Sequence, residues 1–293
     1  MAVSADIKRI AIASGKGGTG KTLLSTNLAA CISRSYPTLL VDLDVEEPDD
    51  FLFIGGVLQK SLVQYKFIPD WNETQCTFCD SCSDHCRFHA ILRLGESIVV
   101  FNELCHSCFA CSELCPSGAI RMKPQKIGET KEFVTGNLRF IHSCLEIGEE
   151  QAVPLIHKTL QLVRNQTGNL PVQLYDCPPG ASCPMVAATK DADFVILVAE
   201  PTPFGIHDFM LAASTVRMLG KPFAAVINRS DMGDDSLEDY CNTGNIPVLA
   251  KIPFSNKISK LYSEGSLVFG NCDVMNPALE KIADYIIQLK LNP

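Results

Sequence analysis

The chain has 293 residues and a formal net charge of −8, from 25 basic and 33 acidic side chains. The acidic balance and the lack of a basic run argue against a nucleic-acid partner. No apolar run approaches the roughly 18 residues that a membrane helix needs, and the polar stretch before the first apolar run is too short for a signal peptide. We therefore expect a cytoplasmic protein that binds neither nucleic acid nor membranes.

Fourteen cysteines are too many for ordinary packing in such a chain. Reducing compartments disfavour disulfides, so metal binding explains the number better. Eight of the fourteen lie between positions 76 and 115. On the usual scale of roughly 100–200 residues per domain, the chain can hold one large domain and a small cysteine-rich one.

The first motif in the chain is a glycine-rich string, Gly15-Lys16-Gly17-Gly18-Thr19-Gly20-Lys21-Thr22. It follows an apolar strand-like run over 7–13 and opens a helical pattern over 22–34. In this context the backbone N–H groups and the helix N-terminus can surround phosphates. Lys21 can reach the β- and γ-phosphates of ATP, or the β-phosphate of ADP, and the Thr22 hydroxyl can ligate Mg²⁺. A glycine-rich turn that binds nothing is the alternative.

A second strand is predicted over 38–41 and ends in Asp42-Leu43-Asp44. Strand, helix and strand at this spacing predict a right-handed unit of a parallel sheet. Ligands bind at the carboxyl ends of such strands, so we expect both aspartates beside the phosphates. Solvated aspartates at a strand end are the alternative. The segment 46–75 has poor periodicity and several Pro and Gly breakers, and we interpret it as a switch and connector.

The next segment contains two cysteine runs of the same spacing. Cys76-x2-Cys79-x2-Cys82-x3-Cys86 is followed by Cys105-x2-Cys108-x2-Cys111-x3-Cys115-Pro116. This is the run of bacterial two-cluster ferredoxins, in which the fourth cysteine ligates the other cluster. The expected ligand sets of two [4Fe–4S] clusters are therefore Cys76, Cys79, Cys82 and Cys115, and Cys105, Cys108, Cys111 and Cys86. Two zinc sites are the alternative.

Alternating strands and helices resume after this insert. Strands are predicted over 133–141 (as a strand or hairpin), 172–175, 194–199, 223–227 and 248–252, and helices over 149–164 and 206–219. Asp176 follows one of these strands and precedes a Pro-Pro-Gly turn, which fits a residue that holds the Mg²⁺ water shell. The segment 277–291 has an apolar helical face, predicted to pack on the sheet rather than on a membrane.

These elements predict an α/β fold. A mostly parallel, doubly wound P-loop sheet is expected from residues 1–74 and 124–293, with a small α+β ferredoxin-like domain inserted at 75–123.

The second lysine of the loop, Lys16, makes the string resemble the deviant P-loop of the MinD/ParA-like ATPases. That group also holds the nitrogenase iron protein and the Mrp-type iron–sulfur carriers. The resemblance implies a homodimer that sandwiches ATP, with Lys16 reaching the partner's nucleotide. It also implies that Asp44 helps to position the attacking water and that Asp42 lies in the Mg²⁺ shell.

The resemblance extends to the base-binding side of the nucleotide. Asn228-Arg229 is similar to the strand end that carries the adenine-contacting asparagine of these ATPases. Pro253-Phe254 is similar to the loop that closes over the base, although a plain turn is an equal alternative for this pair.

Cys183 follows the Pro-Pro-Gly turn at about the position where the nitrogenase iron protein carries a cysteine for its dimer-bridging cluster. Cys144 is the candidate for the second cysteine that such a site needs. The hypothesis is a third cluster shared across the dimer, and the alternative is an inert thiol at either position.

Two functions fit this pattern. In the first, ATP turnover gates electron transfer from the two clusters to a partner redox protein or metallocluster. In the second, the protein is a carrier or assembly factor for an iron–sulfur or mixed-metal cluster. A spatial-positioning ATPase is a weaker third, because basic and membrane-binding segments are missing from the sequence.

Overall fold

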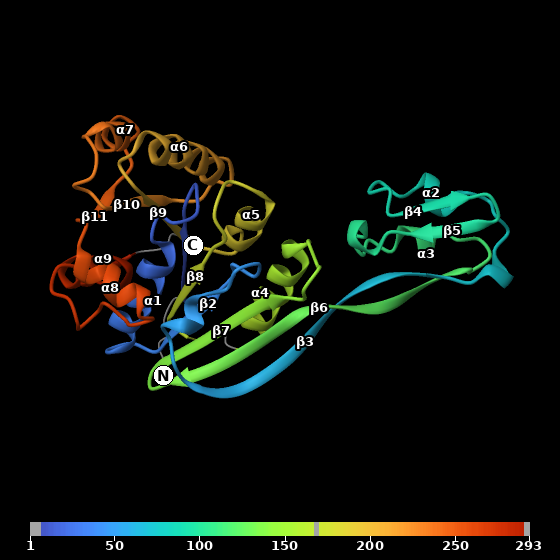
Figure 1. Ribbon diagram of the computed structural model, residues 1–293, viewed down its shortest axis with the longest axis horizontal. Helices are drawn as coiled ribbons and strands as arrows, with labels where there is room; N and C mark the ends of the chain where they lie inside the picture. The colour runs from blue at the N-terminus through green and yellow to red at the C-terminus, as the bar shows by residue number, and fades with distance from the viewer. Residues whose placement is uncertain (1–6, 167–169, 290–293) are drawn as a thin grey trace, which may run out of the picture. The chain divides into compact units, whose positions relative to one another are not determined.

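The computed structural model describes residues 7–166 and 170–289 of the chain. It divides into two compact units. Unit 1 consists of Met1–Ser61, Thr130–Cys144 and Ile156–Pro293, and unit 2 of Leu62–Glu129 and Leu145–Leu155. The ferredoxin-like domain predicted at 75–123 lies inside the sequence range of unit 2 (Figure 1).

A nine-stranded sheet has the order β11-β10-β9-β1-β8-β2-β7-β6-β3. The pairings from β11 through β7 are all parallel. This confirms the predicted α/β fold with a mostly parallel sheet. The strands of this parallel part are β1 (Lys8–Ala13), β2 (Thr38–Asp42), β7 (Leu138–Leu145), β8 (Val172–Asp176), β9 (Phe194–Ala199), β10 (Phe223–Asn228) and β11 (Val248–Ile252).

The inner strands are buried along their whole length, as a parallel sheet covered on both faces requires. Helices connect or follow these strands. They are α1 (Lys21–Ser33), α4 (Ala152–Gln166), α5 (Cys183–Thr189), α6 (Pro203–Met218), α7 (Ser236–Thr243), α8 (Asn256–Ser263) and α9 (Asn276–Gln288).

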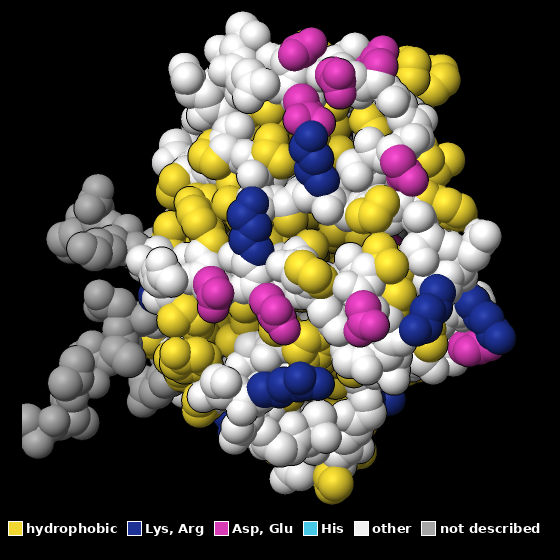
Figure 2. Space-filling view, turned by 90° about the vertical axis from the view of Figure 1, so that its left-hand side faces the viewer, with side chains coloured by type: hydrophobic (Ala, Val, Ile, Leu, Met, Phe, Trp, Pro, Cys, Tyr) yellow, Lys and Arg dark blue, Asp and Glu magenta, His cyan; other side chains and the backbone are white. Residues whose placement is uncertain are grey.

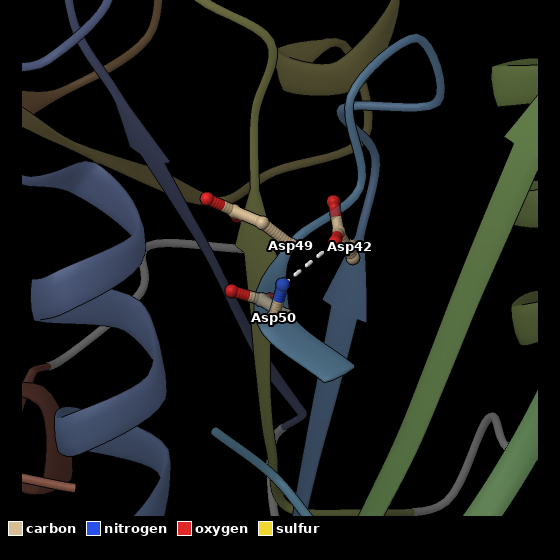
Figure 3. A group of neighbouring side chains, drawn as sticks. All are labelled: Asp42, Asp49 and Asp50. Atoms are coloured by element: carbon tan, nitrogen blue, oxygen red, sulfur yellow. Dashed lines mark hydrogen bonds between the residues drawn. The ribbon is translucent and has the colours of Figure 1, made fainter. Parts of the chain in front are cut away.

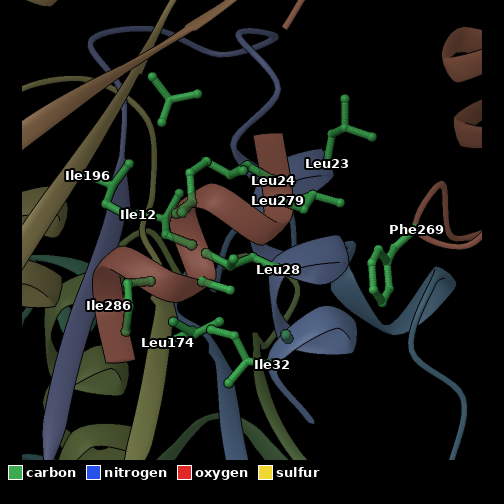
Figure 4. Packing of buried hydrophobic residues seen from close by; sticks show 14 of the residues in the cluster. Ile12, Leu23, Leu24, Leu28, Ile32, Leu174, Ile196, Phe269, Leu279 and Ile286 are labelled. Carbon is green, nitrogen blue, oxygen red and sulfur yellow. The ribbon is translucent and has the colours of Figure 1, made fainter. Parts of the chain in front are cut away.

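Helix α9 packs into the core of unit 1. Leu279, Ile282 and Ile286 are fully buried in the same cluster as Leu24 and Leu28 of α1 (Figure 4). This confirms the prediction that the C-terminal apolar face packs on the sheet. The last residues of the predicted segment, from position 290, lie outside the described residues.

The segment 46–75, interpreted from its poor periodicity as a switch and connector, contains a long regular strand. After a short 3-10 turn at Asp50–Leu52, the chain forms the 15-residue strand β3 (Val57–Trp71). Along β3 the apolar Val63, Tyr65 and Phe67 are exposed, whereas Lys66 is buried. Over 63–67 the apolar side chains therefore face outward and the polar Lys66 faces inward, which is the reverse of an ordinary half-buried strand. Its neighbour β6 (Ile120–Thr135) is joined to β7 by two residues and lies beside it in the sheet. The strand or hairpin expected over 133–141 is therefore a hairpin, and its strands are longer than predicted.

Unit 2 contains short elements around the cysteines. They are two 3-10 turns at Glu73–Gln75 and Asn102–Leu104, the helices α2 (Ser81–Asp84) and α3 (Ala110–Glu113), and the antiparallel strands β4 (Ile91–Leu94) and β5 (Ser97–Val100). Two small apolar clusters in this unit include cysteines among their members.

The face of the molecule drawn in Figure 2 carries Lys, Arg, Asp and Glu side chains interspersed over it rather than gathered by sign. Within the described residues, no helix is both long enough and apolar enough to span a bilayer.

Candidate functional site

The glycine-rich loop is fixed against the end of β10. Gly20 adopts φ 94° and caps α1 at its N-terminus. The Nδ2 atom of Asn228 donates to the carbonyl oxygen of Thr19 at 2.8 Å. A Cβ atom on Gly20 would lie only 2.4 Å from that Nδ2 atom. Glycine is therefore required here both by the backbone conformation and by the close approach of Asn228.

The other end of the loop is equally close to its surroundings. A Cβ atom on Gly15 would lie 2.0 Å from the carbonyl oxygen of Asp208 in α6. Lys21 and Thr22, which begin α1, are 7% and 9% exposed. The loop thus presents its backbone and the N-terminus of α1 in the arrangement that binds phosphates.

Two predicted Mg²⁺-site aspartates lie side by side at the carboxyl ends of their strands. Asp42 of β2 and Asp176 of β8 are register partners, and both are buried. The Thr22 hydroxyl donates to Oδ2 of Asp176 at 2.9 Å. Burial raises the pKa of both carboxyls, while the nearby Lys21 works in the opposite direction on Asp176. A cation would stabilise the ionised form of these side chains.

Asp44 lies next to this pair. Its backbone N–H donates to Oδ1 of Asp42 at 3.0 Å. Burial raises the pKa of Asp44 to about 6, and Lys21 acts against this shift. The structure therefore brings together Lys21, Thr22, Asp42, Asp44 and Asp176, as the sequence predicts.

A cavity of about 280 Å³ adjoins the loop. Its lining includes the four residues predicted for the base-binding side, Asn228, Arg229, Pro253 and Phe254, together with Gly18 and Gly20. Sequence reasoning missed the contribution of α8, because its residues carry no nucleotide motif. The cavity is lined by Gly18, Gly20, Leu23, Asn228, Arg229, Pro253, Phe254, Ser255, Ile258, Ser259 and Tyr262.

The eight cysteines of the double run line two separate cavities in unit 2. One cavity is lined by Cys76, Cys79, Cys82 and Cys115, among other residues. The second cavity is lined by Cys86, Cys105, Cys108 and Cys111, among other residues. These are the two sets predicted from the sequence, including the exchange of the fourth cysteine between the runs.

The two runs share an unusual backbone conformation. Phe78 and Asp80 have φ values of 54° and 64°, and Ser107 and Phe109, at the equivalent positions of the second run, have 52° and 64°. Asp80 and Phe109 cap α2 and α3. Left-handed residues among right-handed ones turn successive N–H groups toward one point, which creates a concave site for an anion. Non-glycine residues adopt this conformation rarely, and such strain is concentrated at functional sites.

The spacing of the sulfur atoms bears on the choice between zinc and iron. Four thiolates on one Zn²⁺ lie about 3.8 Å apart, given Zn–S bonds of about 2.3 Å. Among the described residues, the one group of three or more metal-binding side chains whose ligand atoms all lie within 4.8 Å of one another consists of aspartates. The cysteine sets are wider than a single ion requires. They fit a cluster better, because each thiolate then binds a different iron atom.

A profile described as the CobQ/CobB/MinD/ParA nucleotide binding domain matches residues 10–268. The chain belongs to this family.

The chain is also similar to individual proteins. The uncharacterized protein MJ0579 of Methanocaldococcus jannaschii is 30% identical over 279 residues, which are 95% of this chain and 97% of that protein. The fold is similar to that of MinD from Pyrococcus horikoshii, solved with Mg-ADP, with a TM-score of 0.59, 18% identity and 96% of each chain covered. Over a shorter stretch of 81 residues, 25% of this chain and 82% of the relative, the chain is 32% identical to the pyruvate synthase subunit PorD of Thermotoga maritima.

In this member of the CobQ/CobB/MinD/ParA family the second lysine of the loop is held within its own chain. The Nζ atom of Lys16 lies 3.6 Å from Oε2 of Glu200, and the side chain of Lys16 is 32% exposed. Glu200 is buried and also pairs with Arg229 at 2.6 Å. Sequence reasoning did not assign a role to Glu200, although its place directly after β9 was a usable signal.

The two cysteines considered for a third cluster are both exposed. Cys183 begins α5 and Cys144 lies near the end of β7. Cys177, Cys241 and Cys272 are buried thiols of the core, and Cys31 is half-buried.

A buried ion pair in unit 2 was also missed. Lys66 and Glu149 approach to 2.8 Å, with side chains only 2% and 4% exposed. The next residue, Phe67, accepts a hydrogen bond from the Ser107 hydroxyl through its carbonyl oxygen at 2.6 Å. The pair therefore supports the strand against which the second cysteine run packs.

Proposed function

We propose that this protein is a Mg²⁺-dependent ATPase that works as a homodimer. It couples nucleotide-driven conformational change to electron transfer through two [4Fe–4S] clusters, toward a partner redox protein or metallocluster. The observation that carries the proposal is the pair of cavities in unit 2, each lined by one predicted set of four cysteines.

The nucleotide half of the proposal is supported by the arrangement around the glycine-rich loop. The loop and the start of α1 bind the phosphates, and the cavity beside Asn228 and Phe254 receives the base. Thr22, Asp42 and Asp176 hold the Mg²⁺ ion of the nucleotide, directly or through water. Asp44 orients the attacking water, since its backbone donates to Asp42 and its carboxylate is close enough to Lys21 and Asp176 for their charges to act on it.

The cluster half is supported by the left-handed residues and by the width of the cysteine sets. Cys76, Cys79, Cys82 and Cys115 would hold one cluster, and Cys86, Cys105, Cys108 and Cys111 the other. When bound, such clusters supply one-electron carriers. The chain itself contributes the thiolates, the inward N–H groups and the apolar surroundings of Ile91, Ile98 and Ile120.

The homodimer is supported by the exposure of Lys16 and by its ion pair within the chain. Its partly exposed side chain is paired with Glu200, which has a second cation in Arg229. Lys16 can therefore leave Glu200 for the nucleotide of a partner subunit without leaving that carboxylate unpaired. We further propose a cytoplasmic location without nucleic-acid or membrane partners, because free thiols in this number need reducing conditions.

A carrier or assembly factor for an iron–sulfur or mixed-metal cluster is the second candidate. It is favoured by the exposure of Cys183, since a cluster bound there would be accessible to an acceptor. The two functions differ in how firmly the protein holds its clusters. Clusters with four cysteine ligands stay bound through ATP turnover, whereas a carrier releases its cargo with a change of nucleotide.

The proposal is tested by anaerobic purification, followed by iron and sulfide analysis and EPR spectroscopy with and without Mg·ATP. We expect about eight irons per chain and an EPR spectrum of the reduced protein that changes with nucleotide. A protein that binds zinc, or one whose spectrum ignores nucleotide while ATP is hydrolysed, contradicts electron-transfer coupling.

The same measurement tests the third cluster. A cluster shared between two subunits raises the iron content to about ten per chain. A Cys183→Ala variant then returns to about eight. A content of about eight in the fully reconstituted wild-type protein excludes the shared cluster.

A further inference from the structure

The two cysteine runs fold alike, so their residues can be compared position by position. The Ser83 hydroxyl donates to the carbonyl oxygen of Asp80 at 2.9 Å, and the Ser112 hydroxyl makes the equivalent bond to Phe109, also at 2.9 Å. We call the cavity of Cys76, Cys79, Cys82 and Cys115 the first cavity, and that of Cys86, Cys105, Cys108 and Cys111 the second. Each cavity serves as a reference for the other.

The side chains that line the two cavities differ in polarity at equivalent positions. The first cavity has three hydroxyls and a carboxylate where the second has an imidazole, two phenyl rings and a methyl group. The residues of the first cavity are Thr77, Asp80, Ser81 and Ser117, and their equivalents in the second are His106, Phe109, Ala110 and Phe88.

The Ser117 hydroxyl is the difference that reaches a ligand. Its Oγ atom lies 3.7 Å from Sγ of Cys115. A thiolate that binds iron carries no proton, so in this pair the hydroxyl donates and the sulfur accepts. At the equivalent position of the second cavity, the ring of Phe88 stacks on His106 with centroids 3.8 Å apart. A phenyl ring has no O–H or N–H group to donate to Cys86.

Backbone donors act on both of these sulfur atoms. The N–H of Ala90 donates to Sγ of Cys86 at 3.3 Å. The N–H groups of Ala119, which is equivalent to Ala90, and of Ile120 donate to Cys115. These bonds remain when a side chain is replaced, so a substitution at position 117 isolates the effect of the hydroxyl.

The charged side chains near the cavities have partners. Asp80 of the first cavity pairs with Arg93 at 2.9 Å. Lys66, whose charge acts on Cys105 of the second cavity, pairs with Glu149 at 2.8 Å. Each pair largely cancels its own field at the neighbouring sulfur atoms, so the uncharged donor gains in importance.

The burial of the cysteines acts in the same direction as the hydroxyl. Cys105 and Cys111 of the second cavity are 7% and 9% exposed, whereas their equivalents Cys76 and Cys82 are half-buried. Water near a cluster stabilises its more negative, reduced state.

We propose that the Ser117 hydroxyl makes the cluster of the first cavity the stronger electron acceptor of the two. Each cluster accepts one electron, and no bond forms or breaks. The hydroxyl is held more strongly by the more negative state, so it stabilises the reduced cluster. This order rests on the proposed function and adds to it that the first electron resides in the first cavity.

The test is a potentiometric titration of the full-length protein, purified without oxygen and analysed for iron beforehand. Reduction by dithionite is followed by EPR at pH 8 without nucleotide. We expect two one-electron steps. Ser117→Ala lowers the electron affinity at the higher-potential step about three- to tenfold, which is about 28 to 59 mV for one electron, and leaves the lower step in place.

Two variants control for other effects of the substitution. Ser117→Thr keeps a hydroxyl and therefore keeps the wild-type potentials. Ser112→Ala removes a hydroxyl of the same run that donates to a carbonyl oxygen, and it leaves both potentials unchanged.

The reciprocal change tests the same bond in the second cavity. Phe88→Ser places a hydroxyl beside Cys86, and it raises the lower potential above that of Phe88→Ala, which removes the ring without adding a donor. An iron content of about eight per chain shows that a variant retains both clusters. If Ser117→Ala loses iron, the comparison of the two Phe88 variants decides.

Three results overturn the inference. Two steps that coincide in the wild-type protein mean that the clusters are equal acceptors. Unchanged potentials in Ser117→Ala mean that the hydroxyl does not act on the cluster, and a shift of the lower step means that the order is reversed. Each of these results leaves the two clusters in place, whereas a protein that holds zinc instead of iron refutes the proposed function itself.

Discussion

Replacing Gly20 by alanine tests whether the loop is held in a nucleotide-binding shape by its contact with β10. The substitution acts in two ways. It places a Cβ atom on a residue with φ 94°, and it brings that atom to 2.4 Å from Nδ2 of Asn228. The second effect displaces the amide from the carbonyl oxygen of Thr19, to which it now donates at 2.8 Å.

The two effects can be added. A left-handed conformation costs an alanine about 1–2 kcal/mol, and loss of one hydrogen bond costs about 1 kcal/mol. The sum of about 2–3 kcal/mol corresponds to a loss of affinity of about 30- to 150-fold, at 1.4 kcal/mol for each factor of ten. We expect this loss for Mg·ADP, measured by isothermal titration calorimetry.

Two other glycines separate the contributions. Gly18 has φ 75° but open space around its Cβ position, so Gly18→Ala pays the conformational cost alone and loses about tenfold. Gly55 lies outside the loop, has no such φ and also has open space, so Gly55→Ala binds as the wild type does. If Gly20→Ala binds ADP like the wild type, or no worse than Gly18→Ala, the contact with Asn228 does not hold the loop.

Three further substitutions test other parts of the structure. Glu200→Gln removes the ion pair that holds Lys16, and this partly exposed pair contributes at most about 1 kcal/mol. We therefore expect ATP-dependent dimerisation, measured by sedimentation velocity, to become up to about fivefold tighter. Unchanged or weaker association contradicts this expectation. Lys66→Met leaves the buried Glu149 unpaired, and we expect hydrogen exchange to show a loss of about 3–5 kcal/mol in the local stability of unit 2. The double variant with Glu149→Leu restores most of this stability. Equal losses in the single and double variants would refute the ion-pair argument. Cys86→Ala removes the cluster predicted at Cys105, Cys108 and Cys111, and iron analysis falls from about eight to about four per chain. An EPR spectrum that instead shows loss of the cluster at Cys76, Cys79 and Cys82 would disprove the exchange of ligands.

The elements of unit 1 were predictable because their signals are local. A parallel strand buried on both faces is a continuous apolar run, as in β8 and β9. The loop before α1 is recognisable from its glycines and lysines alone. The acidic residues at the ends of β2 and β8 follow from the rule that ligands bind at the carboxyl ends of parallel strands.

The rest depends on contacts between residues far apart in the chain. The buried Lys66 has its partner 83 positions away, and a lysine in an exposed strand otherwise indicates a solvated side chain. The burial of Asp50 accompanies the return of the loop to the end of β2, where its backbone N–H donates to Oδ2 of Asp42 (Figure 3). Neither the position of Tyr262 in the cavity beside Gly20 nor the ion pair between Lys16 and Glu200 has a sequence motif.

The exchange of Cys86 and Cys115 between the two cavities has a consequence for how unit 2 could have arisen. Each run supplies three thiols to its own cavity and one to its neighbour's. A single ancestral run, standing by itself, could complete a four-thiol cavity only by associating with a second copy of the same peptide. Duplication within one chain would have made that association permanent.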